Sequence, residues 1–288
     1  MPPAGPELTS IRSPRVKAAR QLAKRAFRQR ARAFLAEGPQ AAREALATPA
    51  VVTEVFMTAA ALARHADLAS LAEQRGVPVL QVSGEVMAEL AQTITPQGVL
   101  AVCRFVDVPL AEVTEQTPAL TVILASVRDP GNAGTILRTA DAAGVGAVIF
   151  SDDSVDPYNS KCVRASAGSL FHLPVVTGPA VAAAVAAMRE AGARVLAADG
   201  NAPRTLEDLQ AEGLLAQPTA WLFGNEAWGL PEEVRALADE TVAVPIYGKA
   251  ESLNLAAAAA VCLYGSARAQ AQRSPRGADV TGTTGARV

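Results

Sequence analysis

The sequence predicts an α/β protein in two parts, a small basic N-terminal domain and a larger C-terminal domain built on a parallel sheet. Short β-branched apolar runs alternate with helical patterns along most of the chain. The periodicity is lost over 106–117 and the segment ends at Pro118, which indicates a linker. The apolar run 120–125 then has the character of a buried parallel strand. We therefore expect domains over 1–108 and 119–270, a linker over 109–118 and a disordered tail over 271–288.

Composition places the chain among proteins with a sizeable core. Its 288 residues are 50% hydrophobic but only 4% aromatic, so Ala, Val and Leu must form most of that core. We find neither a signal segment nor an apolar run as long as a bilayer span, and expect a cytoplasmic protein. The dispersed cysteines (Cys103, Cys162, Cys262) predict buried free thiols, and the isolated His65 and His172 predict no metal site.

A net charge of −2 conceals a concentration of positive charge near the N-terminus. Every ionisable residue over 12–32 is basic, and the apolar residues there are spaced for one face of a helix. A solvated basic helix is one interpretation. Phosphate binding is favoured, because like charges at i,i+4 repel each other and a bound phosphate releases counterions. Membrane attachment is disfavoured, since the helix lacks a broad bulky apolar face. The candidate phosphate contacts are Arg15, Arg20 and Arg28.

The rest of the N-terminal region predicts a small α/β layer domain. We expect, in order, a helix ending near 47, a strand over 51–57, helices within 59–75, a strand over 77–82, a helix near 85–91 and a strand over 99–103. The Pro96-Gln97-Gly98 segment before the last strand would serve as a plain turn.

In the C-terminal region we expect a strand over 120–125, a flexible loop over 129–134 and a helix over 135–143. These are followed by a strand within 144–150, a short helix capped by Asn159, a strand over 174–176, a helix over 180–191 and a strand over 193–198. The last elements are a strand over 221–223, a helix over 232–238, a strand over 241–244 and a helix from Leu255. The glycines of 144–150 precede their strand, so a dinucleotide-binding oxidoreductase is disfavoured.

Candidate functional residues gather where strands lead into helices, in the segments 129–138, 223–230 and 245–256. Arg138 lies among apolar neighbours, where a guanidinium could hold a phosphate bidentately or form an ordinary surface charge. Glu226 could accept hydrogen bonds from loop amides and hold its loop shut, or act as a general base, and we favour the structural role. Ser252 is placed to cap the helix that begins at Leu255.

These three segments, together with 156–171, resemble the motifs of the SpoU (TrmH-like) branch of the SPOUT methyltransferases. The segments 34–38 and 95–102 resemble an L30e-like RNA-binding domain, in which Gln97 and Gly98 would lie near RNA. The resemblance implies S-adenosylmethionine-dependent methylation of an RNA ribose 2′-hydroxyl by homodimers whose partner subunit completes each site. It also implies a deep C-terminal trefoil knot, where general rules predict an unknotted doubly wound sheet.

The resemblance also implies a role for each site residue. Arg138, beside an RNA phosphate, would lower the pKa of the ribose hydroxyl or accept its proton, although an arginine is normally protonated. The other catalytic candidates are Asn132, Glu226, Ser252 and Asn254. Cofactor binding falls to Leu222, Phe223, Gly224, Asn225, Gly229, Val244, Ile246, Ser252, Leu253 and Asn254. RNA binding falls to Arg15, Arg20, Arg28, Gln97, Gly98, Arg138 and Arg164.

The substrate is predicted from the same resemblance. Members of the family methylate tRNA or ribosomal RNA, and a complete L30e-like domain favours large-subunit (23S) rRNA. The Ala-, Arg- and Gly-rich composition is similar to that of actinobacterial members, some of which confer antibiotic resistance. The alternatives are a tRNA methyltransferase and a non-catalytic RNA-binding protein on the same scaffold. The combined presence of the five catalytic candidates argues against the latter. The modified nucleotide and a resistance role stay open.

Overall fold

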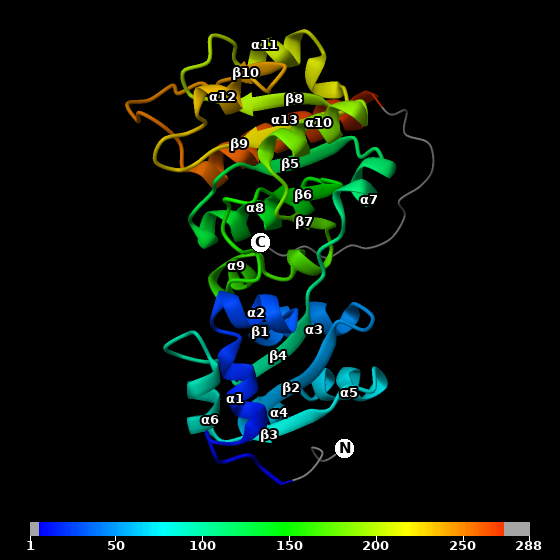
Figure 1. Ribbon diagram of the computed structural model, residues 1–288, viewed down its shortest axis with the longest axis vertical. Helices are drawn as coiled ribbons and strands as arrows, with labels where there is room; N and C mark the ends of the chain where they lie inside the picture. The colour runs from blue at the N-terminus through cyan, green and yellow to red at the C-terminus, as the bar shows by residue number, and fades with distance from the viewer. Residues whose placement is uncertain (1–5, 274–288) are drawn as a thin grey trace.

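Two α/β domains are stacked along the long axis of the molecule (Figure 1) in a computed structural model that describes residues 6–273. The N-terminal domain holds a four-stranded sheet in the order β1-β4-β2-β3, and the C-terminal domain a six-stranded sheet in the order β10-β8-β9-β5-β6-β7. The expected α/β class is confirmed. Within residues 6–273 no helix combines the length and apolar character needed to cross a membrane.

The N-terminal domain follows the expected alternation. Its elements are α1 (Pro14–Gln21), α2 (Arg25–Ala31), β1 (Ala33–Glu37), α3 (Pro39–Ala47), β2 (Val52–Thr58), α4 (Ala59–Arg64), α5 (Ala66–Gln74), β3 (Val79–Val82), α6 (Gly84–Leu90) and β4 (Val99–Arg104). Strand β4 pairs antiparallel with β1 and β2, whereas β2 and β3 are parallel. The hydroxyls of Thr58 and Ser83 cap α4 and α6, because each accepts a backbone N–H of the first turn.

The basic segment forms two helices rather than the single helix that the sequence predicted. The chain is extended at Lys24, between α1 and α2. Arg28 explains the break, since its Nη1 donates to the carbonyls of Leu22 and Ala23, each at 2.9 Å. The Arg28 side chain is buried and bonded to Asp156 in the other domain, so the assignment of Arg28 to RNA binding is wrong. Arg20 is exposed but pairs with Glu89 at 2.8 Å.

The segment expected as a linker contains a helix. Helix α7 (Leu110–Glu115) buries Val113 against the C-terminal domain and packs on α10 (Val181–Glu190). Asp107, just before it, forms a bridge to Val175. A helix of one or two turns is too short to produce a recognisable period in the sequence, which is why it was not predicted.

The C-terminal domain has a sheet in which every neighbouring pair of strands is parallel. Its other elements are β5 (Leu120–Leu124), α8 (Pro130–Ala142), β6 (Ala147–Phe150), α9 (Ser160–Ala165), η1 (Ser169–Phe171), β7 (Val175–Thr177), β8 (Arg194–Ala198), α11 (Leu206–Ala211), η2 (Leu214–Ala216), β9 (Thr219–Phe223), α12 (Glu232–Arg235), β10 (Glu240–Val242) and α13 (Leu255–Arg273). Asn159 caps α9 as expected. The sequence did not predict α11. The knot stays a prediction.

Two expectations about chain segments need correction. The loop predicted over 129–134 is the beginning of α8, because Asp129 accepts the backbone N–H of Asn132 and Pro130 suits a first turn. Of the tail expected over 271–288, residues 271–273 belong to α13, and the remainder lies outside the described residues.

The two domains meet through a compact junction. The rings of Phe105 and Tyr158 stack with centroids 3.8 Å apart, and Phe34 packs against both. The Tyr158 hydroxyl donates to Asp107 and accepts the backbone N–H of Val106. The N-terminal domain is therefore held in a fixed position beside α8 and α9, close to the loops that carry the candidate site.

Candidate active site

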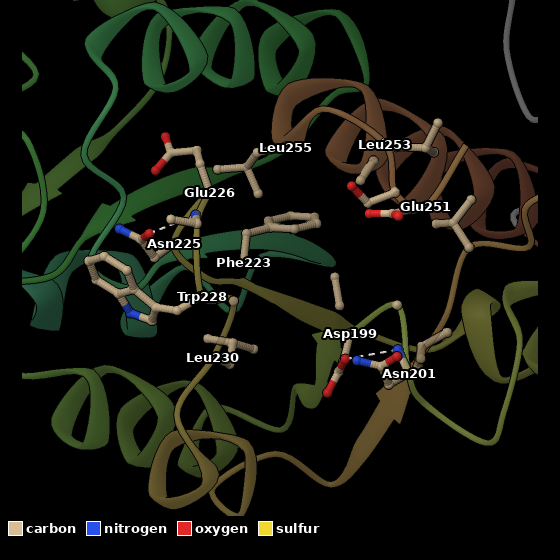
Figure 2. Close-up of a pocket in the computed structure, with 18 of the residues that line it drawn as sticks. Asp199, Asn201, Phe223, Asn225, Glu226, Trp228, Leu230, Glu251, Leu253 and Leu255 are labelled. Carbon is tan, nitrogen blue, oxygen red and sulfur yellow. Dashed lines mark hydrogen bonds between the residues drawn. The ribbon is translucent and has the colours of Figure 1, made fainter. Parts of the chain in front are cut away.

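A cavity of about 450 Å³ lies at the carboxyl ends of β8, β9 and β10 (Figure 2). In open parallel sheets, ligands bind at this end of the strands. Phe223 and Leu255 contribute apolar surface, while Asp199, Asn201 and Glu251 contribute polar groups. Of the predicted cofactor residues, those that line it are Phe223, Asn225, Gly229, Val244, Ile246, Ser252 and Leu253. The cavity thus brings together the second and third motif segments.

The other predicted cofactor residues do not line the cavity. Leu222 is fully buried in the core behind the sheet. Gly224 packs so closely on Gly229 that a Cβ on Gly224 would lie 2.5 Å from the Gly229 carbonyl, so only glycine fits. Asn254 is directed toward Asn132 on α8. Gly224 and Asn254 thus support the loops around the cavity, whereas Leu222 belongs to the core.

The loop after β9 is a tight hairpin closed on itself. Asn225 and Gly229 exchange two backbone hydrogen bonds of 2.9 Å, and Gly229 has φ +68°. The buried Asn225 side chain accepts the N–H of Ala227 and donates to the carbonyl of Ser126, both at 2.8 Å. The hairpin is thereby fixed to the loop after β5, and it presents Glu226 to that loop.

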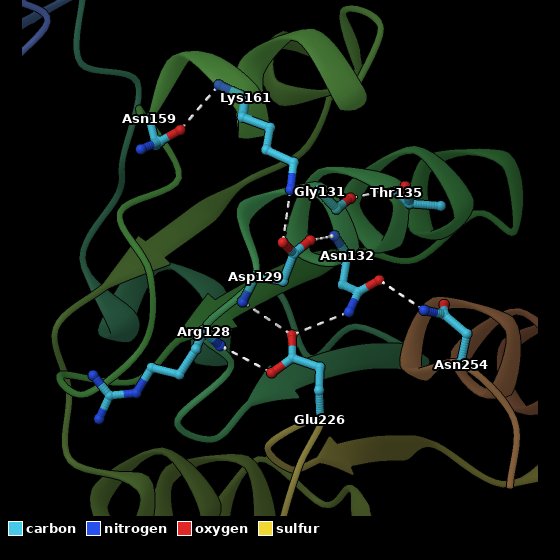
Figure 3. Close-up of polar contacts among 9 residues, drawn as sticks. All are labelled: Arg128, Asp129, Gly131, Asn132, Thr135, Asn159, Lys161, Glu226 and Asn254. Atoms are coloured by element: carbon cyan, nitrogen blue, oxygen red, sulfur yellow. Dashed lines mark hydrogen bonds and ion pairs between the residues drawn. The ribbon is translucent and has the colours of Figure 1, made fainter.

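Glu226 is the acceptor that joins the motif segments (Figure 3). Its carboxylate accepts the backbone N–H groups of Arg128 and Asp129 at 3.2 and 3.0 Å, and the Asn132 amide at 3.2 Å. Burial opposes its ionisation, but the N–H donors of its own loop, of Arg128 and Asp129 and of Asn132 outweigh burial and hold the pKa of Glu226 below its usual range. A carboxylate with a lowered pKa is a poor general base, so the geometry favours the structural role.

Asn132 and Asn254 connect the first motif segment to the third. Asn132 Oδ1 accepts a hydrogen bond of 3.0 Å from Asn254 Nδ2, while its own Nδ2 donates to Glu226. Asn254 Oδ1 accepts the N–H groups of Ala256 and Ala257, which makes Asn254 the cap of α13. The expectation that Ser252 caps this helix is therefore wrong. Ser252 stands two residues too early and lines the cavity instead.

Positive charge is concentrated beside these residues. Lys161, on α9, forms an ion pair of 2.7 Å with Asp129, and its ammonium holds the pKa of Asp129 below the usual range despite burial. The exposed Arg128 side chain extends away from Glu226 (Figure 3), and within residues 6–273 it has no carboxylate partner. Sequence reasoning missed Arg128, although its place directly before the first motif segment was a usable signal.

Asp199, Arg235 and Trp228 are among the cavity residues that were not predicted from the sequence. Asp199 follows β8 and accepts a hydrogen bond of 2.8 Å from Arg235. Burial opposes the ionisation of Asp199, but Arg235 and the Asn201 N–H outweigh it and hold the pKa of Asp199 low. Trp228, on the hairpin, is 60% exposed at the rim. A polar residue directly after a parallel strand was the signal for Asp199.

The predicted RNA-binding residues lie in different places. Arg138 is exposed on α8 and does not line the cavity, and its side chain forms no hydrogen bond within the described chain. Arg164 donates to Glu37 at 3.2 Å across the domain junction, near Gln97. Gly98 is buried, and its carbonyl accepts the Thr58 N–H. Arg15 is exposed on α1.

The cysteines are buried and have free thiols, as expected. Burial raises the pKa of each of them, which makes these thiols unreactive. The described part of the chain has no cluster of three or more metal-ligating side chains.

The fold and the site define a two-domain α/β protein with a ligand cavity at the carboxyl ends of its parallel strands. The SpoU rRNA Methylase family matches residues 119–264, and the MRM3-like substrate binding domain matches residues 13–101. The chain belongs to the SpoU rRNA methylase family. The resemblance predicted from the motif segments is thereby confirmed.

Individual relatives cover nearly the whole chain. The 23S rRNA (guanosine(2553)-2′-O)-methyltransferase RlmP of Bacillus subtilis is 33% identical over 275 residues, which span 90% of this chain and 98% of RlmP. The AdoMet-bound rRNA methyltransferase from Sinorhizobium meliloti superposes with a TM-score of 0.79 and 31% identity, covering 91% of this chain and 97% of its own. The AdoMet complex of AviRb from Streptomyces viridochromogenes superposes with a TM-score of 0.76 and 29% identity. This match covers 90% of this chain and 100% of the AviRb chain.

Proposed function

We propose that this protein transfers a methyl group from S-adenosylmethionine to a ribose 2′-hydroxyl of large-subunit rRNA. One observation carries the proposal. Asn132 joins Glu226 and Asn254, which are 94 and 122 residues away, into one hydrogen-bonded arrangement next to a ligand cavity. Membership of the SpoU rRNA methylase family and the similarity to rRNA 2′-O-methyltransferases support the same function.

The cavity has properties suited to S-adenosylmethionine. Its volume of about 450 Å³ lies within the range of about 300–1,000 Å³ typical of ligand sites. The apolar surface of Phe223, Leu230 and Leu255 suits an adenine ring. The carboxyl oxygens of Asp199 and Glu251 offer acceptors for hydroxyl and ammonium groups. When bound, this cofactor supplies a methyl group already activated by its sulfonium.

The residues of the chain would then align the ribose and help remove one proton. A ribose hydroxyl is a weak nucleophile, so orientation and a lowered pKa are the contributions the protein can make. We assign this contribution to Arg138, whose guanidinium would hold the adjacent phosphate and stabilise the developing alkoxide, while the proton of the 2′-hydroxyl passes to solvent water. Asn132, whose amide oxygen and nitrogen are both held by hydrogen bonds, would hold the ribose. Arg128 and Lys161 would attract the RNA backbone.

The position of Arg138 supports a homodimer. Arg138 does not line the cavity of its own chain, so a second copy is the natural source or recipient of this guanidinium. Helix α13 carries a stripe of exposed Ala257, Val261 and Tyr264, spaced four and three residues apart on one face. An apolar stripe of this kind is typical of an interface. We propose that two copies pair so that each supplies Arg138 to the other's site.

The RNA would lie along both domains. Arg15, Gln97 and Arg164 are the proposed contacts outside the catalytic loops, and the N-terminal match to a substrate binding domain supports this assignment. The buried Gly98 would shape the loop that carries Gln97. We favour rRNA over tRNA because the rRNA methyltransferases reported above match almost the full length of both chains. We place the reaction in the cytoplasm.

The test is transfer of labelled methyl from S-adenosylmethionine to naked large-subunit rRNA and, in parallel, to bulk tRNA. Alkali does not cleave beside a 2′-O-methylated ribose, so the label should appear in an alkali-resistant dinucleotide from rRNA. Label in an alkali-resistant dinucleotide from tRNA alone would show that tRNA, and not rRNA, is the substrate. Label released in a mononucleotide would indicate base methylation and contradict the proposal, as would the absence of label from both RNAs.

A further inference from the structure

A second hollow, of about 390 Å³, lies at the junction of the two domains. Its lining comes from β1 and the start of α3, from the loop between α6 and β4, and from α9. The residues are Glu37, Gly38, Gln40, Ala41, Thr93, Thr95, Gln97, Arg164 and Ala167. Figure 1 places the α6–β4 loop on the same side of the molecule as the loop that leads into α13. The hollow is separate from the cavity at the strand ends.

Glu37 builds this hollow in advance of any ligand. Its side chain is 5% exposed and accepts the backbone N–H of Gln92 at 3.0 Å and the hydroxyl of Thr93. The same carboxylate accepts Arg164 Nη1 from the other domain at 3.2 Å. One buried charge thus fixes the α6–β4 loop and α9 relative to each other, so the hollow has a defined shape.

Polar groups at the hollow retain hydrogen-bonding capacity. Within residues 6–273 the Gln97 amide forms no hydrogen bond, and the Arg164 guanidinium forms one, to Glu37. Gly38 has φ +99°, and a Cβ there would lie 3.2 Å from Gln97 Oε1, so glycine leaves this amide its space. An amide can donate and accept, as the edges of nucleobases do, and the remaining N–H groups of Arg164 suit a phosphate.

The tip of the α6–β4 loop carries an apolar side chain with no cover from the described chain. Ile94 is fully exposed, next to Thr93 and Thr95 of the hollow. Ile94 does not line the hollow itself, so its side chain is available to the part of a ligand that projects from the hollow. Unpaired bases present flat apolar faces, whereas double-stranded RNA presents mainly its backbone and hydroxyls. The combination therefore favours a single-stranded ligand.

Helix α9 connects the hollow to the catalytic loops. Lys161 near its beginning pairs with Asp129 at the start of α8, and Arg164 lies one turn later at the hollow. A helical turn advances about 5.4 Å, so Lys161 beside the start of α8 and Arg164 at the hollow are close enough for one RNA strand to contact both.

We propose that this junction hollow binds one unpaired nucleotide of the RNA substrate, close in the strand to the methylated one. Gln97 contacts the base edge, Ile94 the base face and Arg164 the phosphate. This inference rests on the proposed function. It adds that recognition requires an unpaired nucleotide at a fixed distance from the target, set by the junction between the domains.

The first test compares two tryptophan substitutions in the full-length protein. Gln97→Trp fills the hollow, whereas Gln74→Trp adds the same side chain to the exposed end of α5, away from it. With 23S rRNA as substrate, Gln97→Trp should raise KM about tenfold or more, since single base contacts are worth about that much. The affinity for S-adenosylmethionine should stay within about twofold, and Gln74→Trp should match the wild type. An unchanged KM for Gln97→Trp overturns the proposal.

The second test measures RNA contact without turnover. Large-subunit rRNA transcribed with 4-thiouridine is crosslinked to the wild-type protein, and the attached peptides are identified. Crosslinks within 92–98 or 160–167 support the hollow. Crosslinks confined to other segments overturn it, even when methyl transfer is normal. Failure of methyl transfer with crosslinks at the hollow would contradict the proposed enzyme activity and leave the binding site standing.

Discussion

The Asn132 amide donates to the Glu226 carboxylate at 3.2 Å, although 94 positions separate the two residues in the sequence. Glu226 also accepts two backbone N–H groups from the turn that starts α8. The carboxylate therefore adds a second connection between these two loops, which the Asn225 side chain already joins through the Ser126 carbonyl. Because its pKa is lowered, it stays ionised at neutral pH and keeps accepting all three donors.

We predict that Glu226→Gln loosens the loops around the cavity. A neutral amide is a weaker acceptor and places an N–H where an acceptor is needed, and hydrogen bonds to charged groups contribute about 1.5–3 kcal/mol each. The affinity for S-adenosylmethionine, measured by calorimetry, should fall about tenfold or more. Glu233→Gln, at an exposed position on α12, is the control and should bind normally. Normal cofactor affinity with a lost rate and a shifted pH profile would instead indicate a general base.

Arg138→Ala should abolish methyl transfer and leave the affinity for S-adenosylmethionine within about twofold, because Arg138 does not line the cavity. Loss of both together would count against the assigned role.

If the guanidinium serves the partner's site, mixing Arg138→Ala with Glu226→Ala subunits creates mixed dimers with one intact site. About a quarter of the wild-type activity should then return, since random pairing yields half mixed dimers. If no activity returns, Arg138 acts in the active site of its own subunit.

Much of this arrangement could be read from the sequence, because strands and their exits leave local patterns. The run 120–125 and the polar residues after 223 were recognised from apolar continuity and turn residues. Asn132 and Glu226 could be chosen as candidates for the same reason. Their mutual hydrogen bond could not, since nothing in a sequence gives the distance between two loops that lie far apart along the chain.

The errors have physical causes as well. Arg28 was assigned to RNA binding because its sequence neighbours are basic. The Arg28 side chain is instead buried in an ion pair with Asp156 of the other domain, which its neighbours in the sequence do not reveal. Ser252 is a good capping residue by type, but Asn254 lies one position before the first helical residue and caps the helix. The expected loop at 129–134 contains two glycines and a proline, and the Asp129 cap nevertheless starts a helix there. Tertiary partners and caps outweighed local propensity in each case.

The domain junction should weaken as pH rises above neutrality. His172 Nδ1 lies 2.8 Å from Asp141 and Nε2 lies 3.3 Å from Glu44 of the other domain. The Asp141 hydrogen bond, assisted by Glu44 and opposed by burial, raises the pKa of His172 above its usual value. The stabilisation is complete below the unfolded pKa of about 6.5 and is lost as pH rises through the folded one.

Melting temperatures of the wild type and His172→Gln measure this effect. Because the pair is partly exposed, its contribution is about 0.5–1 kcal/mol, or about 2 °C for a protein of this size. The difference between the two proteins should be present at pH 6 and vanish near pH 9. His65→Gln, outside the junction, should behave as wild type at both values. A difference independent of pH would show that packing rather than protonation is responsible.

The buried ion pair between Arg28 and Asp156 gives the largest predicted effect on stability. Arg28 donates through Nε and Nη2 to Asp156 Oδ2 at 2.9 and 2.7 Å, and both side chains are about 5% exposed or less. Removing one partner leaves the other charge unpaired in the interior, which costs about 3–5 kcal/mol. Asp156→Ala and Arg28→Ala should each lower the free energy of unfolding in urea by about that amount. Arg28→Ala additionally leaves the Leu22 and Ala23 carbonyls without their donor.

The exposed pair of Arg20 and Glu89, 2.8 Å apart, is the matched control, and Arg20→Ala should cost at most about 1 kcal/mol. The double substitution Arg28→Ala with Asp156→Ala should cost clearly less than the sum of the single ones, because no unpaired charge is left behind. Additive costs would mean that the two side chains stabilise the junction independently.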